Sequence, residues 1–211
     1  MAINIAQATQ DDLPDLAEVN RSAYSGEAAS RFAHKNWRDE KHVYEFFRGR
    51  LTSRFQDEAM QVLKAVEADT NKIVGFACLT LETDNEAGPT PTGMMLQKMP
   101  PSMNKDFIVA AGTKIEQLRE HRRDEKHYYL STLAVTPERQ GRGIGSQLLK
   151  YCLEMSDKAS LPCWLIAFPA SYQIYLRFGF EKVDHRDIEL NHWDSYKFRG
   201  YGIYQNYSMV R

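Results

Sequence analysis

Apolar and polar residues along the chain follow two spacings, one typical of strands and one of helices. Ile3 and Ile5 alternate with polar neighbours, and so do the apolar positions of residues 61–67. Residues 73–81 form an apolar stretch rich in β-branched and aromatic side chains. Alternation is typical of strands, and the polar residues 69–72 have the composition of a turn. We therefore expect a short first strand, followed later by an antiparallel hairpin of 61–67 with 73–81.

Helical spacing fills the segments between and after these strands. Thr9 followed by Asp12 is a helix-start signal, and Pro14 is tolerated because it lies near that start. An apolar residue every third or fourth position then predicts helices over 13–23, 43–55, 107–118 and 143–155. A short helix is expected at 172–177, with Gly179 as its left-handed cap.

The second half of the chain adds further strands. Residues 128–135 and the apolar run 163–168, which lies between Pro162 and Pro169, have strand character. Another strand starts at 180–183, and Ile203 and Tyr207 belong to a last antiparallel strand in the tail. Neither an internal repeat nor a linker divides the sequence. Residues 1–211 are therefore expected to form a single α/β domain.

The segment from Thr83 to Asn104 differs from the rest because prolines, glycines and methionines are concentrated in it. A long loop in a compact domain is usually functional or mobile, and methionines offer an adaptable apolar surface. The segment is therefore either a lid over a substrate or a disordered insertion, and the sequence leaves both interpretations open.

Composition narrows the class of protein. The chain has 211 residues, 43% of them hydrophobic and 26% charged, which fits one packed globular domain. A formal net charge of −1 argues against a nucleic-acid partner, and the mixed-sign run 121–127 has the composition of a solvated segment. We expect no membrane partner, because every apolar stretch is shorter than the roughly 20 residues that span a bilayer.

Cysteines and histidines give no sign of a metal or a disulfide framework. The three cysteines lack paired spacing and stand in apolar stretches, so we expect buried thiols in a reducing compartment. The six histidines lack metal-ligand spacing, so no metal is expected. The first residues resemble no signal peptide. A cytoplasmic location follows as the expectation.

The strongest chemical signal is a glycine-rich turn between a predicted strand and a predicted helix, Gln140-Gly141-Arg142-Gly143-Ile144-Gly145. Exposed N–H groups and a partial positive charge at a helix start attract anions, and glycines let phosphate oxygens approach the backbone. The alternative is a tight turn that needs glycine for backbone reasons alone. The spacing fits neither a Walker loop nor a dinucleotide-binding GxGxxG motif.

Two segments together resemble a known family. Residues 133–149, LAVTPERQGRGIGSQLL, resemble the acetyl-CoA motif of the GNAT superfamily of N-acetyltransferases, and residues 175–181, YLRFGFE, are similar to its second motif. The resemblance implies the GNAT fold: a central, mixed but mostly antiparallel twisted sheet of about seven strands, flanked by helices and splayed at the cofactor site. It also implies acetyl-CoA as co-substrate.

The resemblance assigns roles to particular residues. Backbone groups of residues 133–135 would pair with the pantetheine arm, and amides of 140–146 would hold the pyrophosphate. Tyr175 would protonate the departing thiolate, although packing in the core is the alternative role for its ring. The residues expected to contact the cofactor are Leu133, Ala134, Val135, Gln140, Gly141, Arg142, Gly143, Ile144, Gly145, Ser146, Ser171 and Tyr172.

The chain departs from the family pattern at two places. Phe168 stands where many members have an asparagine, so that polar contact is lost or moved to Ser171. Tyr129 and Ser131 stand where arylalkylamine-type members have histidines. The general base is therefore unassigned. Glu82 is our candidate, with Asp84 as an equal; a solvated loop charge is the alternative for both, and His127 is weaker.

The resemblance implies acetyl transfer to a primary amine by direct attack in a ternary complex. Aromatic residues in the tail (Trp193, Tyr196, Phe198, Tyr201, Tyr204 and Tyr207) hint at a small aromatic or apolar amine. Protein N-termini or lysines are the alternative acceptors, and a non-catalytic acyl-CoA sensor is the alternative function. Monomer and homodimer both remain open.

Overall fold

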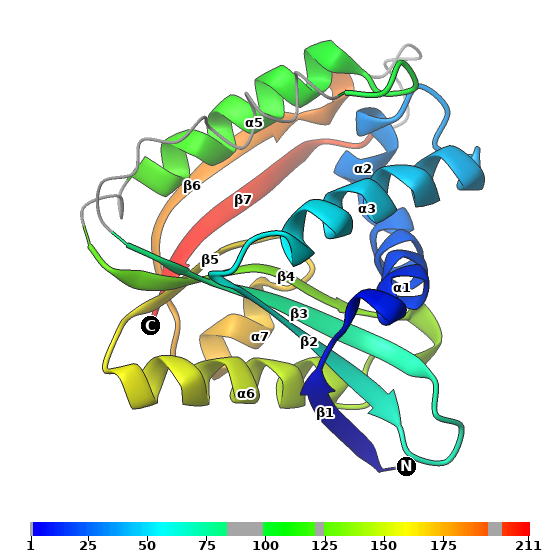
Figure 1. Ribbon diagram of the computed structural model, residues 1–211. Coiled ribbons are helices and arrows are strands. Elements are labelled where there is room, and N and C mark those ends of the chain that lie inside the picture. Colours follow the sequence, from blue (N-terminus) through cyan, green and yellow to red (C-terminus); the bar gives the residue numbers. More distant parts are fainter. Residues whose placement is uncertain (1, 84–98, 121–124, 194–199) are drawn as a thin grey trace. The chain divides into compact units, whose positions relative to one another are not determined.

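The computed structural model describes residues 2–83, 99–120, 125–193 and 200–211 (Figure 1). Its chain forms two compact units, each assembled from three separate segments. The first unit comprises Met1–Gly26, Asp39–Glu82 and His127–Cys163. The second comprises Glu27–Arg38, Thr83–Lys126 and Trp164–Arg211. Because the segments interleave along the sequence, neither unit is a continuous piece of chain.

The first unit holds an antiparallel sheet with strand order β1-β2-β3-β4 and three long helices. Its elements are β1 (Ile3–Gln7), the 3-10 turn η1 (Gln10–Asp12), α1 (Leu13–Ser25), α3 (Glu40–Phe55), β2 (Met60–Glu67), β3 (Ile73–Glu82), β4 (His127–Val135), the 3-10 turn η3 (Pro137–Arg139) and α6 (Ile144–Ala159). The predicted hairpin is confirmed as β2 and β3.

The 3-10 turn η1, which leads into α1, has the predicted capping box. The backbone N–H of Thr9 donates to Asp12 Oδ2 at 2.7 Å, and Pro14 stands in the first turn. Lys64 Nζ of β2 also donates to Asp12 Oδ2, at 2.7 Å. One carboxylate therefore fixes the helix start and joins it to the sheet.

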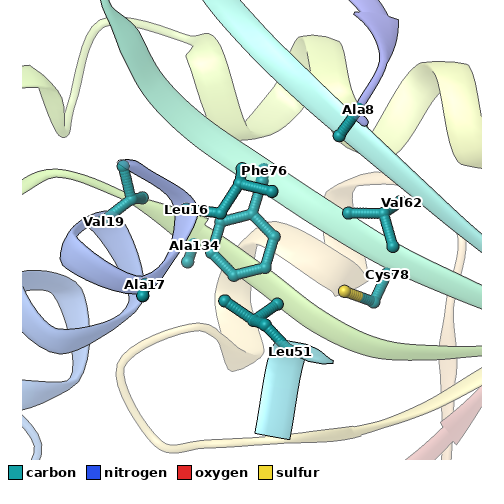
Figure 2. Close-up of a cluster of buried hydrophobic side chains, with 9 residues drawn as sticks. All are labelled: Ala8, Leu16, Ala17, Val19, Leu51, Val62, Phe76, Cys78 and Ala134. Carbon is teal, nitrogen blue, oxygen red and sulfur yellow. The ribbon is translucent and has the colours of Figure 1, made fainter. Parts of the chain in front are cut away.

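Helices cover both faces of this sheet. Phe76, Cys78 and Ala134 of β3 and β4 pack with Leu16 of α1 and Leu51 of α3 in a buried cluster (Figure 2). The neighbouring Gly75 points to the opposite face, where an added Cβ would lie 3.3 Å from Leu148 Cδ1 of α6. Because side chains alternate along a strand, α1 and α3 lie on one face and α6 on the other.

Strand β4 carries a bulge against β3. Cys78 pairs with Thr132 and Leu79 pairs with Leu130, so Ser131 is an extra residue. Bulges bend a strand and are frequent beside active sites. Beyond the bulge, the pairs of Thr80 with Tyr129 and of Glu82 with His127 continue the alternation. As a result, Thr132, Tyr129 and His127 lie on the face that carries Cys78.

The second unit holds the remaining strands in the order β5-β7-β6, both pairs antiparallel. Its elements are α2 (Ala28–Ala33), α5 (Lys105–Arg119), β5 (Cys163–Ala167, whose first residue belongs to the first unit), α7 (Tyr172–Arg177), β6 (Glu181–Glu189), the 3-10 turn η4 (Leu190–His192) and β7 (Ile203–Val210). The short helix 172–177 and the last strand are confirmed. Helix α2 was not predicted, and β6 extends beyond the predicted start at 180–183.

The cysteines, the Pro- and Met-rich segment and the lengths of the helices can also be compared with the predictions. Cys78, Cys152 and Cys163 are free and buried as predicted, and burial raises the pKa of the Cys152 thiol. Of the Pro- and Met-rich segment, residues 84–98 lie outside the described residues, so its role as lid or insertion stays a prediction. In the described part of the chain, each helix is too short or too polar to cross a membrane.

Candidate functional site

The turn that joins β4 to α6 contains two glycines in the left-handed region. Gly141 has φ +72° and Gly143 has φ +80°. An added Cβ at either position would meet no atom within 4 Å. The backbone conformation explains both glycines, as the tight-turn interpretation expects, and the space beside them is open. A phosphate oxygen could therefore approach the backbone at this turn.

The start of α6 has the features of an anion site. Gly143 is its N-cap and supplies no side-chain hydrogen bond, and no acidic residue stands in the first turn. The first N–H groups of a helix lack partners within the helix and carry a partial positive charge. Arg142 is exposed beside them. A pyrophosphate fits this arrangement because it would supply both the missing acceptors and the opposite charge.

Strand β4 leads directly into this turn. Gln140 Nε2 donates to the carbonyl of Val135 at 3.0 Å, which ties the turn to the strand end. The three residues before the turn have alternating burial, with Ala134 buried and Leu133 and Val135 partly exposed. An added Cβ on Gly75 would lie 2.9 Å from the carbonyl oxygen of Ala134, so only glycine lets β3 approach here.

Tyr175 belongs to α7 in the second unit. Its side chain is buried, and its ring packs edge-on against Phe180 at 5.6 Å between centroids. Gly179, at φ +83°, allows the N–H of Phe180 to donate to the Tyr175 carbonyl at 3.1 Å. The motif therefore builds a compact turn with Tyr175 inside it. Packing against Phe180 therefore explains the position of the ring.

The two other predicted cofactor contacts of the second unit have local partners. Ser171 Oγ donates to the carbonyl of Phe168 at 3.2 Å, so its hydroxyl offers only acceptor capacity to a ligand. Tyr172 stacks on Tyr207 with centroids 4.3 Å apart. Their contact with the cofactor stays a prediction.

The candidate bases Glu82 and His127 form a pair. The last residue of β3 stands opposite the first residue of β4, and His127 Nε2 lies 3.2 Å from Glu82 Oε2. His127 is buried, and Glu82 is partly exposed. In the sequence analysis Glu82 and His127 were alternative candidates for the base, but the strand register brings them together as one hydrogen-bonded pair. Asp84 lies outside the described residues.

Sequence reasoning missed Arg54, at the end of α3. Its Nη1 donates to Thr132 Oγ1 at 2.5 Å and to Cys78 Sγ at 3.2 Å. Thr132 directly precedes the segment 133–135. No motif marks this contact, because the partners are 24 and 78 residues away in sequence.

The described aromatic residues of the tail pack on aromatic side chains from earlier parts of the chain. Tyr204 contacts Phe168 and donates a hydrogen bond to Glu27, and Trp193 packs on Phe107. Tyr201 packs on Phe32. Tyr196 and Phe198 lie outside the described residues. Within residues 2–83, 99–120, 125–193 and 200–211, no group of three His, Cys, Asp or Glu side chains is arranged to hold a metal.

The amino-acid sequence of the chain matches a known protein family. A family profile described as Acetyltransferase (GNAT) family matches residues 27–180, which is more than half of the chain. The match includes the first sequence motif and all but the last residue of the second. The chain belongs to the GNAT acetyltransferase family. As a member, it is an acetyl-CoA-dependent N-acetyltransferase.

Individual relatives of this GNAT protein are distant in sequence. An uncharacterized N-acetyltransferase of Schizosaccharomyces pombe is 21% identical over 203 residues, covering 81% of this chain and 78% of the relative. The structure of a polyamine N-acetyltransferase from Drosophila melanogaster has a TM-score of 0.70 at 14% identity, covering 100% of this chain and 99% of that one. A PaiA N-acetyltransferase from Thermoplasma acidophilum, in complex with coenzyme A, has a TM-score of 0.60 at 17% identity, with coverage of 100% and 99%.

The likeness of these structures confirms the predicted fold class. Seven strands in a mixed sheet flanked by helices are the architecture of GNAT acetyltransferases. At these identities the likeness shows the fold and not the substrate.

Proposed function

We propose that this GNAT protein transfers the acetyl group of acetyl-CoA to a small primary amine by direct attack in a ternary complex. The observation that carries the proposal is the uncapped start of α6 beside two left-handed glycines. This arrangement favours a phosphate-bearing ligand, and it lies within the matched family region. We also propose that both units act as one acetyltransferase domain, since residues 27–180 include segments of each.

The residues present fit acetyl-CoA, which when bound supplies the acetyl thioester. Backbone amides of 140–146 and the side chain of Arg142 would hold its pyrophosphate. Backbone groups of Leu133 and Val135 would pair with its extended arm, as an added strand pairs with a sheet edge. Ser171 and Tyr172 are proposed as further contacts.

Glu82 and His127 are proposed to take the proton that the amine must lose. A protonated amine is not a nucleophile, and a hydrogen-bonded imidazole and carboxylate are suited to accept its proton. In this pair Glu82 orients the ring and stabilises the imidazolium that forms. The partly exposed carboxylate also gives the proton a route to solvent.

Tyr175 is proposed as the general acid for the thiolate. A phenol has a pKa of about 10 and a thiol about 8.5, so proton transfer between them costs little. The packing of its ring on Phe180 holds the side chain in one orientation.

A small amine is proposed as the acceptor, in line with the polyamine N-acetyltransferase of the same fold. The aromatic tail gives an aromatic acceptor no separate support, because its described members already pack on Phe32, Phe107 and Phe168. The net charge of −1 gives no large cationic or anionic field for docking a protein tail.

The experiment is a thiol-release assay with acetyl-CoA over a panel of amines, with the acetylated product identified by mass spectrometry. We expect release that depends on both the amine and the protein. Tyr175→Phe should lower kcat roughly 100-fold, because it removes the acid and keeps the ring. Tyr151→Phe, at an exposed position of α6, is the matched control and should leave kcat unchanged.

A non-catalytic acyl-CoA sensor would behave differently in the same assay. Acetyl-CoA would then raise the melting temperature while no amine releases thiol above background. That result would contradict the proposed transfer. Loss of cofactor binding in Tyr175→Phe would instead show that Tyr175 acts through packing.

A further inference from the structure

Two arginines stand one helical turn apart on α3, and neither forms an ion pair with a carboxylate among the described residues. Residues four apart on a helix share a face, so Arg50 and Arg54 are neighbours. The ion pairs of α3 in the described part of the chain involve Glu40, His42 and Arg48 instead. Arg54 donates to a hydroxyl and a thiol, both neutral, and Arg50 lies over the ring of Phe46. Within the described ranges, no carboxylate therefore neutralises the positive charge of this pair.

The surroundings of Arg50 disfavour its positively charged form. The pKa of Arg50 is lowered to about 10, first by desolvation and then by the like charge of Arg54. The Arg50 side chain nevertheless keeps access to solvent, and Arg54 is partly buried. The partly buried Arg54 gains more from an anionic ligand than a fully hydrated cation does, because water screens it less.

The position of the pair separates it from the cofactor turn. Arg54 contacts Cys78 and Thr132, on the sheet face covered by α1 and α3, whereas α6 lies on the opposite face. Figure 2 shows Cys78 beside Leu51 on that face. The anion that these arginines would hold is therefore distinct from the pyrophosphate at the start of α6.

The same face also carries the groups proposed for chemistry. Thr132 precedes the segment proposed to hold the cofactor arm, and the β4 bulge at Ser131 lies beside it. Farther along the strand, on the same face, stands His127 with Glu82. An acceptor held by the arginines would lie on the face that carries the base, four strand residues (about 13 Å) from Glu82 and His127, so water would carry the amine proton to the pair.

We propose that the acceptor amine carries an anionic oxygen group, a carboxylate or a phosphoryl group, and that Arg54 binds it with the help of Arg50. Guanidinium groups bind both anions through paired, charge-assisted hydrogen bonds. The inference rests on the proposed amine acetylation and narrows its acceptor to amino acids or phosphorylated amines.

The test uses acceptor pairs that differ by the anionic group. Tyramine is compared with L-tyrosine and histamine with L-histidine for the carboxylate, and ethanolamine with O-phosphoethanolamine for the phosphoryl group. We expect wild-type protein to favour the acidic member of at least one pair. In Arg54→Gln, kcat/KM for that member should fall at least tenfold, mainly through KM, because a charged hydrogen bond contributes about 1.5–3 kcal/mol.

The neutral member and two further variants separate recognition from folding. The neutral member should keep its kcat/KM in Arg54→Gln, and Arg54→Lys should restore part of the loss. Arg48→Gln is the matched control, because Arg48 is exposed on the same helix and pairs with Glu45. If Arg54→Gln unfolds, Arg50→Gln is expected to give the same selective loss.

Three results would overturn the inference or the function beneath it. Equal losses for both members would show that Arg54 only docks α3 on the sheet. A wild-type preference for neutral members would reject the anionic acceptor and leave amine acetylation standing. If neither member is acetylated while acetyl-CoA binds, the proposed function fails; the anion site then stands only if the acidic members raise the melting temperature of wild-type protein and not of Arg54→Gln.

Discussion

Single glycines decide whether the cofactor turn can form. Gly143 has φ +80°, a conformation that costs other L-residues roughly 1–2 kcal/mol. Its missing side chain also leaves the start of α6 open. The two effects can be measured separately. Backbone strain at residue 143 would lower the stability of the folded protein, whereas an added Cβ would obstruct the ligand.

Gly143→Ala is expected to lower the free energy of unfolding by about 1 kcal/mol and to weaken acetyl-CoA binding by roughly tenfold. Gly200→Ala is the matched control, since Gly200 has φ +68° and equally open surroundings but lies in the second unit. It should lose similar stability and keep its affinity. Thermal unfolding and calorimetric titration measure both quantities. Equal affinity losses in the two variants would contradict the role of this turn.

Pairs of elements, rather than single residues, create the candidate base. Only the register of β3 against β4 brings the carboxylate of Glu82 within 3.2 Å of His127. A second pair of this kind, His42 with Asp39, lies exposed on α3 and has no proposed role. The chain therefore offers a matched control for the catalytic pair.

His127→Gln is expected to slow acetylation roughly 100-fold at neutral pH, because the positioned proton acceptor is lost. The remaining rate should climb with pH as the amine substrate loses its proton in solution. His42→Gln should leave both the rate and its pH profile unchanged. A pH–rate profile of the three proteins measures this, and an unaltered profile in His127→Gln would rule the pair out as the base.

The Asp12 carboxylate, which connects η1 and α1 to β2, makes part of the free energy of unfolding depend on pH. Burial favours a raised pKa for the Asp12 carboxyl, but hydrogen bonds from Lys64 and Thr9 outweigh it, so the pKa is lowered. The stability from these bonds is present above the unfolded pKa of about 3.9 and is lost as pH falls through the folded pKa.

Asp12→Ala is expected to lower the free energy of unfolding by about 1–2 kcal/mol at neutral pH, since it removes the cap and the ion pair. The gap to wild type should close as the pH falls below about 4. Asp11→Ala, at the exposed neighbouring position, is the control. Denaturant unfolding at a series of pH values measures the gap, and a gap that stays constant down to low pH would refute this linkage.

Sequence patterns correctly predicted the structural features that depend on residues close together in the chain. Helical spacing and Thr9 located α1, and Gly179 was correctly expected to be left-handed. Ser131 could not be predicted to be a bulge, because a bulge depends on how β3 pairs with β4. Arg54 was missed for the same reason: its partners are distant in sequence. Long-range register therefore determined the parts of the site that local spacing could not reveal.

At the scale of the whole molecule, the proposed site residues come from both units. The turn at the start of α6, Arg54 and the pair of Glu82 with His127 belong to the first unit, and Tyr175 belongs to the second. Each unit is assembled from three segments of the chain. A ligand that binds the folded protein stabilises it by mass action.

Acetyl-CoA binding tests the central claim most directly, because every proposed role depends on the cofactor. The measurement is the melting temperature of the full chain at increasing acetyl-CoA concentration. We expect a rise that grows with concentration, with a stabilisation of about 2.7 kcal/mol when acetyl-CoA is at a hundred times its Kd. A melting temperature that does not change at any concentration would contradict the central claim.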